Sequence, residues 1–383
     1  WGDFDGDGDL DLATGNYNEQ NLLYRNSPPA LTVNKPGTGS GTVTSAPAGI
    51  DCGITCTTSV AYGTPITLTA SPERGSMFIG WAGACSGTAT CTLPMTATQS
   101  VTATFDLLPP LALIAHLPTT NTVAVPVSSR IVLTYNVDVD TATVTNRTVA
   151  VHSMMHGLLT ATPDATDNVV TVTPARPFFP GELVYTSATT QTTNIGGPPT
   201  SSSTIWQFQT ETAPGGILDT TINVGTSGAF LQSMAWGDYD NDGDLDLAVG
   251  NYDGVNLLYR NNGSGTFGSP ISIGGASATT WGVAWGDIDG DGDLDLAVAN
   301  YEGQDAIYPN NGNGSFGSPI NIGTTNSTST SLAWGNFDGN GDLDLIVGQE
   351  NAPNLLYRNN GAGTFASGVN VSGDNRATIS VAA

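Results

Sequence analysis

Aspartates are concentrated in four short segments that share one pattern, an acidic or amide residue at every second position. The segments begin at Asp3, Asp238, Asp287 and Asn336. Three of them carry five aspartates each and the fourth carries three, so together they hold more than half of the 34 acidic residues. Carboxylates this close repel one another unless a cation neutralises them. Because a solvated acidic turn would not explain four parallel copies, the pattern predicts cation-binding loops.

The spacing resembles the first part of an EF-hand calcium loop, in which alternate residues face inward and a glycine permits the tight turn. Gly8, Gly243, Gly292 and Gly341 stand at that turn position. No helical pattern follows the loops and no glutamate closes them, so they are not EF-hands. Hard oxygen ligands on a flexible loop favour Ca²⁺ over Mg²⁺, and we expect up to four Ca²⁺ ions, one per loop.

In each loop we expect the first, second, third and fifth of these positions to supply side-chain ligands and the fourth to supply its backbone carbonyl. The fourth loop has amides at Asn336 and Asn340 and should bind more weakly. The candidate metal-binding residues are Asp3, Asp5, Asp7, Asp9, Asp11, Asp238, Asp240, Asp242, Asp244, Asp246, Asp287, Asp289, Asp291, Asp293, Asp295, Asn336, Asp338, Asn340, Asp342 and Asp344.

The loops belong to a longer repeat that begins with Trp-Gly. Its copies start at Trp1, Trp236, Trp285 and Trp334, and the last three are 49 residues apart. In the second copy, short strands are expected at 247–250, 256–260 and 266–271, in addition to the strand that leads into the tryptophan. Four short antiparallel strands per period are typical of propeller blades. We therefore predict an all-β fold with four propeller-blade repeats.

The first copy is interrupted. Residues 1–26 match the front of a period, and its remainder starts near Gly216, so an insertion of about 27–212 occupies a strand-connecting turn, where inserted domains are best tolerated. The expected domains are 1–26, the front of the first repeat; 27–107 and 108–212, two inserted β-domains; and 213–383, the rest of the first repeat and three further repeats.

Both ends of the chain are in phase with the repeat. Trp1 starts a copy, and Ala383 stops where the next tryptophan would fall. The absence of an initiator methionine suggests a removed signal or a longer polypeptide. Three interpretations fit: a ring of four blades closed within one chain, which removes exposed sheet edges; head-to-tail assembly, in which one unit completes the blade of the next; or a chain that simply ends at a repeat boundary.

Composition excludes several classes of protein. Gly contributes 48 residues and Pro 22, while 11% are charged, which favours turn-rich β-structure. The length of 383 residues predicts two to four domains. Nine basic residues against 34 acidic ones, with Lys35 the only lysine, argue against nucleic-acid binding. No apolar run is long enough to span a bilayer, so membrane insertion is not expected.

Four cysteines, Cys52, Cys56, Cys85 and Cys91, lie close together. An even, local set is typical of disulfides in an oxidising compartment, and Cys52–Cys56 with Cys85–Cys91 is the favoured pairing of three. A four-cysteine zinc site is the alternative, although the spacing departs from the usual zinc knuckle.

Residues for catalysis are scarce. The histidines are His116, His152 and His156, and the last two stand four apart, a spacing that can share a metal on a helix. They lie in a strand-rich segment, which favours ordinary core residues. No nucleophile elbow occurs and glutamates are few, so we expect no enzymatic activity.

Five sequons could carry glycans if the protein is exported. They are at Asn146, Asn262, Asn313, Asn326 and Asn370, and Asn262 and Asn313 are expected in exposed turns between blade strands.

The repeats resemble the FG-GAP/VCBS repeats of integrin-type β-propellers, whose calcium loops read Asp-x-Asp-Gly-Asp-Gly-x-x-Asp. The segments 3–11 and 287–295 match this form fully, while Asn241, Asn336 and Asn340 depart from it. The resemblance covers about half the chain. It implies calcium that stiffens the blades, in proteins of the cell surface or outside the cell, and it does not imply catalysis. Family propellers commonly have more than four blades.

The insertion resembles two bacterial modules. The segment Gly75-Ser-Met-Phe-Ile-Gly-Trp-Ala-Gly-Ala-Cys-Ser-Gly is similar to the divergent InlB-type B-repeat. Residues 109–212, with Ser128-Ser-Arg-Ile-Val-Leu-Thr-Tyr and Trp206-Gln-Phe-Gln-Thr, are similar to bacterial Ig-like domains of surface-layer proteins. Both resemblances imply spacer or adhesive modules on bacterial exteriors.

These observations predict a non-enzymatic, calcium-stabilised structural protein, secreted or at the cell surface and bacterial. Its expected partner is itself, head to tail in a fibril, or neighbouring repeats of a longer chain. The alternative is an adhesin, in which a closed propeller face binds glycans or host surface proteins. A polysaccharide lyase or hydrolase is the third, least favoured hypothesis.

Overall fold

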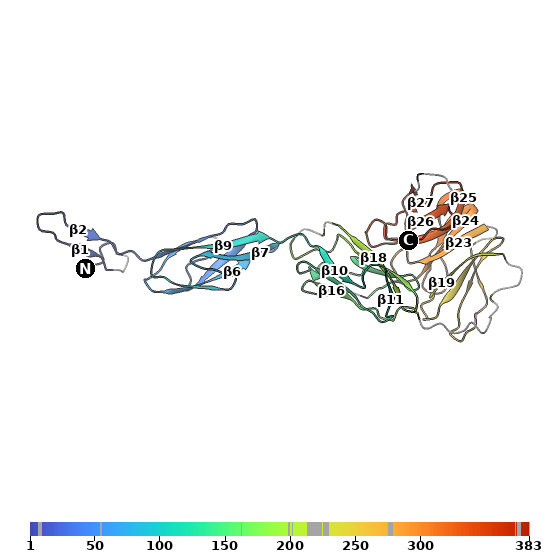
Figure 1. The fold of residues 1–383 in the computed structure, drawn as a ribbon, viewed down its shortest axis with the longest axis horizontal. Coiled ribbons are helices and arrows are strands. Elements are labelled where there is room, and N and C mark those ends of the chain that lie inside the picture. The colour runs from blue at the N-terminus through green and yellow to red at the C-terminus, as the bar shows by residue number, and fades with distance from the viewer. Residues whose placement is uncertain are drawn as a thin grey trace. The chain divides into compact units, whose positions relative to one another are not determined.

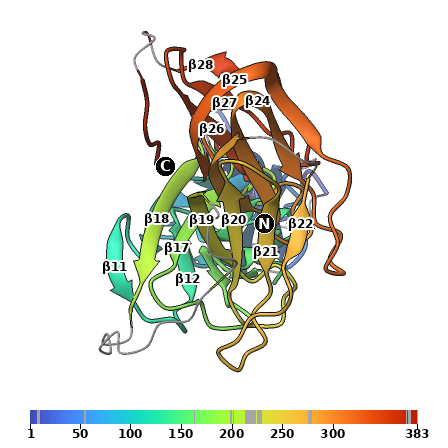
Figure 2. The same ribbon diagram turned by 90° about the vertical axis from the view of Figure 1, so that its right-hand side faces the viewer.

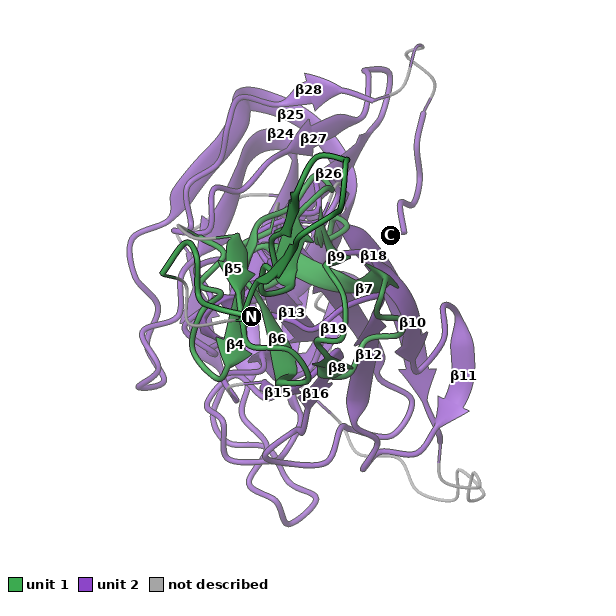
Figure 3. Cartoon of the chain, turned by 90° about the vertical axis from the view of Figure 1, so that its left-hand side faces the viewer, with its two compact units in different colours: residues 1–110, 194–198 green, residues 111–193, 199–383 purple. Residues whose placement is uncertain are grey.

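The computed structural model describes the chain except for residues 7–9, 54–55, 162, 198–199, 201, 213–223, 225–229, 275–278, 372, 374–376 and 383. The protein is all-β: its strands are shown in Figure 1, and the one helical segment among the described residues is a single 3₁₀ turn, η1 (Thr141–Thr143). No described helix is both long enough and apolar enough to cross a bilayer. The chain divides into two compact units, residues 1–110 with 194–198 and residues 111–193 with 199–383 (Figure 3).

The first unit contains a hairpin and a sandwich. The hairpin, β1 (Leu12–Thr14) and β2 (Leu22–Tyr24), belongs to the first repeat. The first sandwich packs the sheet β5-β3-β9-β7 on the sheet β4-β6-β8. Its strands are β3 (Ala30–Asn34), β4 (Gly41–Ala46), β5 (Thr57–Ser59), β6 (Pro65–Pro72), β7 (Ser76–Gly83), β8 (Cys91–Pro94) and β9 (Gln99–Leu107).

Alternation of apolar and Thr/Ser positions builds the first sandwich. In β9, Val101, Ala103 and Phe105 are buried and the residues between them are partly exposed, as expected for strands with one wet face. Disulfides Cys52–Cys56 and Cys85–Cys91 are present, in the pairing favoured by the spacing. Since no described cysteine is free, no thiolate remains for the alternative zinc site.

The second sandwich packs the sheet β10-β12-β16-β15 on the sheet β11-β18-β17-β13-β14. Its strands are β10 (Leu113–Leu117), β11 (Thr122–Val125), β12 (Ile131–Tyr135), β13 (Val149–Ser153), β14 (Gly157–Leu158), β15 (Asp164–Thr166), β16 (Val169–Val172), β17 (Leu183–Ala188) and β18 (Thr204–Thr210). Leu133, Val170, Val184 and Phe208 meet in one core drawn from both sheets. Burying each such side chain stabilises the fold by roughly 1.5–3 kcal/mol.

The repeats after Trp236 form antiparallel sheets, β19-β20-β21-β22 and β23-β24-β25-β26-β27-β28 (Figure 2). β24 covers the positions that β20 and β21 occupy one period earlier, so the second sheet contains two periods joined edge to edge. The strands are β19 (Leu231–Gly237), β20 (Asp246–Asn251), β21 (Asn256–Tyr259), β22 (Ile271–Ile273), β23 (Thr279–Gly286), β24 (Asp295–Tyr308), β25 (Ile320–Gly335), β26 (Asp344–Gln349), β27 (Leu355–Tyr357) and β28 (Val369–Asn370).

Successive repeats are joined through the tryptophan of the Trp-Gly motif. The indole Nε1 of Trp285 donates to the carbonyl of Ala235 at 3.1 Å, and Trp334 donates to Ala284 at 3.3 Å. The glycine of the motif leaves room for the next indole, since a Cβ at Gly286 would lie 2.8 Å from Nε1 of Trp334. The pair Trp285-Gly286 therefore both inserts into the previous repeat and accepts the tryptophan of the next one.

Two expectations about the repeats stay predictions. Residues 213–223 and 225–229, expected to complete the first repeat, lie outside the described part of the chain. Within the described ranges no sheet closes into a ring, and β1 and β2 pair only with each other. The number of blades and the choice between ring closure and head-to-tail assembly therefore stay predictions.

A buried glutamate in the second sandwich gives the protein a specific pH dependence. Glu182 has no exposed surface; its carboxylate accepts the N–H of Phe179 at 2.7 Å and the hydroxyl of Ser153. Burial raises the pKa of Glu182 to about 7. The folded state thus holds this proton more tightly than the unfolded chain, and stability falls as pH rises from the unfolded pKa through about 7.

We expect the free energy of unfolding of the wild type, relative to Glu182→Gln, to fall by about 2 kcal/mol between pH 5 and pH 8. Urea unfolding of both chains at the two pH values measures this difference. Parallel pH profiles for the two chains would contradict the assignment.

Candidate functional site

Each acidic loop connects two antiparallel strands of a repeat. The loops join β19 to β20, β23 to β24 and β25 to β26, and their ends pair as Gly237–Asp246, Gly286–Asp295 and Gly335–Asp344. In the first repeat, an isolated bridge joins Gly2 to Asp11 in the same way. The strand register therefore fixes where every loop begins and ends.

Two left-handed backbone positions give the loops their shape. The residue after the second acid has a positive φ in all four loops, with Asn241 at 59° and Gly290 at 71° as examples. A second positive φ occurs at Gly243, Gly292 and Gly341. Only glycine, and less readily asparagine, adopts this conformation without strain, which explains the residue types in the motif.

The first carboxylate of a loop holds the turn in place. In the third loop, Asp287 accepts the N–H of Gly290 at 2.7 Å through Oδ1 and that of Gly292 at 2.9 Å through Oδ2. In the second loop, Asp238 Oδ2 accepts from Gly243 at 3.0 Å, while its Oδ1 is buried and has no hydrogen-bond partner.

The last carboxylate has a role that the sequence interpretation missed. Asp295 accepts two backbone N–H groups, from Ile288 at 2.8 Å and from Asn310 at 2.7 Å. The same pair of bonds recurs in the other loops, to Asp11 from Phe4 and Asn26, to Asp246 from Tyr239 and Asn261, and to Asp344 from Phe337 and Asn359. The constant asparagine 15 residues after this aspartate was the signal available in the sequence.

Three of the four loops bring carboxylates together closely enough to share a cation. In each cluster, one carboxylate oxygen from every member lies within 4.8 Å of the others. The clusters are Asp3, Asp5 and Asp11; Asp238, Asp240 and Asp246; and Asp287, Asp289 and Asp291. Among the residues that the structure describes, the fourth loop has no such cluster. Asp7 and Asp9, candidate ligands of the first loop, are not among the described residues.

The clusters place negative charge where solvent is limited. Burial raises the pKa of Asp238 to about 6, that of Asp246 to about 7 and that of Asp295 to about 8. In the first repeat, the backbone donors of Asn26 and Phe4 instead lower the pKa of Asp11. A hard cation among these oxygens would favour the ionised form and would use the unpartnered Oδ1 of Asp238.

The second sandwich lies directly on the loops of the later repeats, within the same compact unit. The contacts are the Asp238 N–H to the Met155 carbonyl at 2.9 Å, the Leu158 N–H to Asp287 Oδ2 at 2.9 Å, and His152 Nε2 to the Gly341 carbonyl at 2.8 Å. The acidic loops are therefore part of an internal interface as well as candidate metal sites.

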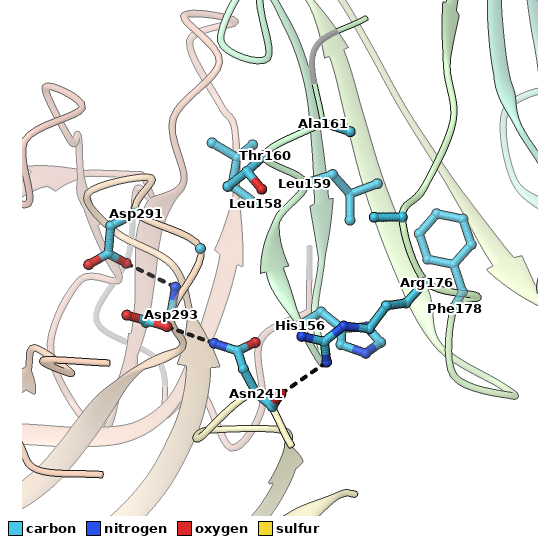
Figure 4. A pocket seen from close by; sticks show the side chains of 12 residues that line it. His156, Leu158, Leu159, Thr160, Ala161, Arg176, Phe178, Asn241, Asp291 and Asp293 are labelled. Atoms are coloured by element: carbon cyan, nitrogen blue, oxygen red, sulfur yellow. Dashed lines mark hydrogen bonds between the residues drawn. The ribbon is translucent and has the colours of Figure 1, made fainter. Parts of the chain in front are cut away.

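A cavity of about 320 Å³ lies at this junction (Figure 4). Leu159 and Phe178 supply apolar surface, and Asp291 and Asp293 of the third loop supply carboxylates. Arg176 donates to the carbonyl of Asn241 at 3.1 Å, and the Asn241 amide donates to Asp293 at 2.6 Å.

The remaining candidate residues are the histidines and the sequon asparagines. His116 packs on the indole of Trp206 with ring centroids 4.2 Å apart, and His156 stacks on Phe179 at 4.3 Å. Burial lowers the pKa of His156 to about 4, so this side chain is neutral near pH 7. Of the sequon asparagines, Asn262, Asn313, Asn326 and Asn370 are exposed and Asn146 is half-buried.

Comparisons with known protein families match the repeats and the first sandwich. Residues 238–298 and 287–347 match the FG-GAP-like repeat, and residues 1–44 match the FG-GAP repeat. Residues 31–108 match the divergent InlB B-repeat domain. The chain is thus a repeat protein, and FG-GAP repeats indicate an extracellular binding or structural role; the two disulfides agree with an extracellular setting.

Similarity to individual proteins is limited. No curated protein matches the chain. Among solved structures, it is similar to a lectin from Agrocybe aegerita described as recognising non-reducing terminal N-acetylglucosamine, with 26% identity over 37% of this chain and 38% of the lectin. The TM-score is 0.29, so this likeness carries no argument about the present chain.

Replacing a last carboxylate should destabilise its repeat independently of any metal. We expect Asp295→Ala to lose roughly 2–3 kcal/mol in EDTA, because two backbone N–H groups become unsatisfied. The matched control is Asp291→Ala, which removes a charge from the same loop at an exposed position. Urea unfolding of both variants measures the difference, and equal losses would contradict the role of Asp295.

Proposed function

We propose that this protein is a non-enzymatic, extracellular structural repeat protein whose acidic loops are held by Ca²⁺. The observation that carries the proposal is the recurrence of three clusters, each with three carboxylate oxygens within 4.8 Å, at equivalent turns of successive repeats. The export of such a protein fits its two disulfides, and we infer a secreted or cell-surface location on a bacterium.

The donor chemistry favours calcium. All candidate ligands are hard oxygens on loops with two left-handed positions, and Ca²⁺ accepts such flexible, high-coordination sites more readily than Mg²⁺ does. In the second loop, Asp238, Asp240 and Asp246 would hold the ion, and Asp238 Oδ1 offers a buried acceptor with no other partner. The bound ion would neutralise the loop and fix the hairpin that connects two blade strands.

The repeat edges support assembly between copies of the chain. Trp285 and Trp334 are 3% and 2% exposed because each inserts into the preceding repeat, whereas Trp1 and Trp236 are 80% and 47% exposed. Phe4, Leu23 and Tyr24 of the first repeat are also exposed, although their counterparts Tyr239, Leu258 and Tyr259 are buried. A second copy that presents the same Trp-Gly edge would complete this contact, which gives head-to-tail growth of a fibre.

A binding function is the second candidate. The cavity beside the third loop combines apolar side chains with carboxylates and an arginine, a composition that suits a small polar ligand. On this alternative, the protein is an adhesin for glycans or host surface proteins.

Removal of calcium tests the central proposal. Each occupied site adds about 2.7 kcal/mol of stability when free calcium is a hundred times its Kd, so the Tm should rise with calcium, fall with EDTA and change less with magnesium. Asp240→Asn should reduce the calcium response, and Asp253→Asn, an exposed acid outside the loops, should not. A Tm that EDTA leaves unchanged would reject calcium stabilisation.

Assembly is tested at the exposed tryptophan. In calcium, we expect multimers that grow with concentration, visible by light scattering and electron microscopy. Trp236→Ala should stay monomeric because it removes the indole that a second copy buries. Tyr62→Ala, which removes another exposed aromatic ring, should assemble like the wild type. Discrete wild-type monomers at all concentrations would contradict the fibre.

A further inference from the structure

The fourth acidic loop has the same backbone shape as the others but a different set of side-chain groups. Asn336 stands where the other loops have their first aspartate, and its Oδ1 accepts the Gly339 N–H at 2.8 Å. Its Nδ2 is consequently a donor, and it is buried without a hydrogen-bond partner. At the equivalent position of the second loop, the unpartnered buried atom is an acceptor, Asp238 Oδ1. A cation is attracted by the acceptor and repelled by the donor.

The second amide of this loop is also committed to internal bonds. Asn340 accepts the Asp342 N–H at 2.8 Å and donates through Nδ2 to the Asn359 carbonyl at 3.2 Å. Asp344 accepts two backbone N–H groups, as in every loop. The side chains of Asn336 and Asn340 therefore form hydrogen bonds within the repeat at positions where the other loops have carboxylates.

A positive charge reaches the fourth loop from the second sandwich. Arg147, which lies between η1 and β13, donates through Nη1 to Asp342 Oδ1 at 2.9 Å and through Nη2 to the Asp289 carbonyl of the third loop at 2.5 Å. The guanidinium thus bridges two neighbouring loops. A fixed fork of donors suits this bridging better than a single ammonium group would.

Glycines in the third and fourth loops allow Arg147 to approach the backbone closely. A Cβ at Gly290 would lie 2.4 Å from Arg147 Nη2, and a Cβ at Gly341 would lie 2.5 Å from the Arg147 carbonyl oxygen. His152, on β13, places Nε2 2.8 Å from the Gly341 carbonyl, which adds a second contact to the same turn. Gly290 therefore leaves room for the Arg147 side chain, and Gly341 leaves room for the Arg147 backbone.

We infer that the fourth loop binds no cation and serves only as a docking site for the second sandwich, which also contacts the second and third loops, and that the Arg147 guanidinium supplies the positive charge there. This inference rests on the proposed function, because it assigns calcium to the other three loops. It changes the sequence expectation of up to four ions to three per chain.

Counting ions in the full chain tests the first half of the inference. Calcium per chain is measured by equilibrium dialysis and elemental analysis for the wild type and for the double variant Asn336→Asp/Asn340→Asp. Three ions in the wild type and four in the double variant support the inference. Four in the wild type, or no gain in the double variant, overturn it. No ions in the wild type would instead contradict the proposed calcium function. In that case hydrogen exchange decides whether the fourth loop is a docking site.

Hydrogen exchange tests the second half of the inference, the docking of the second sandwich on the fourth loop. We expect Arg147→Gln to increase amide exchange at least about tenfold in the β13–β14 hairpin and in residues 336–344, with or without calcium, because the bridge between loops and sandwich is lost. Arg130→Gln, at an exposed arginine of the same sandwich, is the control and should leave exchange unchanged. Unchanged exchange in Arg147→Gln would overturn the docking role.

Discussion

The concentration of carboxylates at the hairpin turns is the constraint on which the rest of the structure depends. Three of the loops bring three carboxylates within a few ångströms of one another, and in all four the last aspartate is buried and bonded to two backbone N–H groups. Burial opposes the ionisation of a carboxyl group, and for this reason the pKa of Asp295 is raised. This charge needs neutralising partners. Arginines contact three of the loops: Arg25 at the first, Arg176 and Arg260 at the second and Arg147 at the fourth. The proposed metal ion would supply further positive charge in the carboxylate clusters.

The same turns position the contacts between repeats. The last aspartate pairs with the glycine of the Trp-Gly motif, so fixing the loop also fixes the tryptophan beside it. Trp285 and Trp334 then insert into the preceding repeat and donate to its backbone. The conformation of each loop therefore affects the packing of neighbouring repeats, and a cation bound in the loop, as we propose, would also affect the proposed assembly.

The second sandwich contacts the acidic loops of the later repeats directly. Its β13–β14 hairpin and Arg147 reach the second, third and fourth loops with backbone and side-chain bonds. An inserted domain with no such contacts would be free to move on its connections. The second sandwich instead forms hydrogen bonds with the loops, so its docking and the ionisation of the loops influence each other.

The sequence by itself determined the repeats, their period and the acidic loops, because a regular motif encodes local structure directly: Asn241 and Gly290 stand where the backbone is left-handed, and Val101 and Phe105 alternate along a strand with one buried face. It also favoured the disulfide pairing that the structure has, but four cysteines allow three pairings and only the folded sandwich selects one of them. It could not separate the roles of equivalent residues. That Asp295 closes the loop, that the Asn336 amide turns its donor inward, and that Arg147 meets Asp342 from 195 residues away are outcomes of tertiary packing. A motif specifies which groups are near in the chain, and only the packed fold decides which distant group neutralises them.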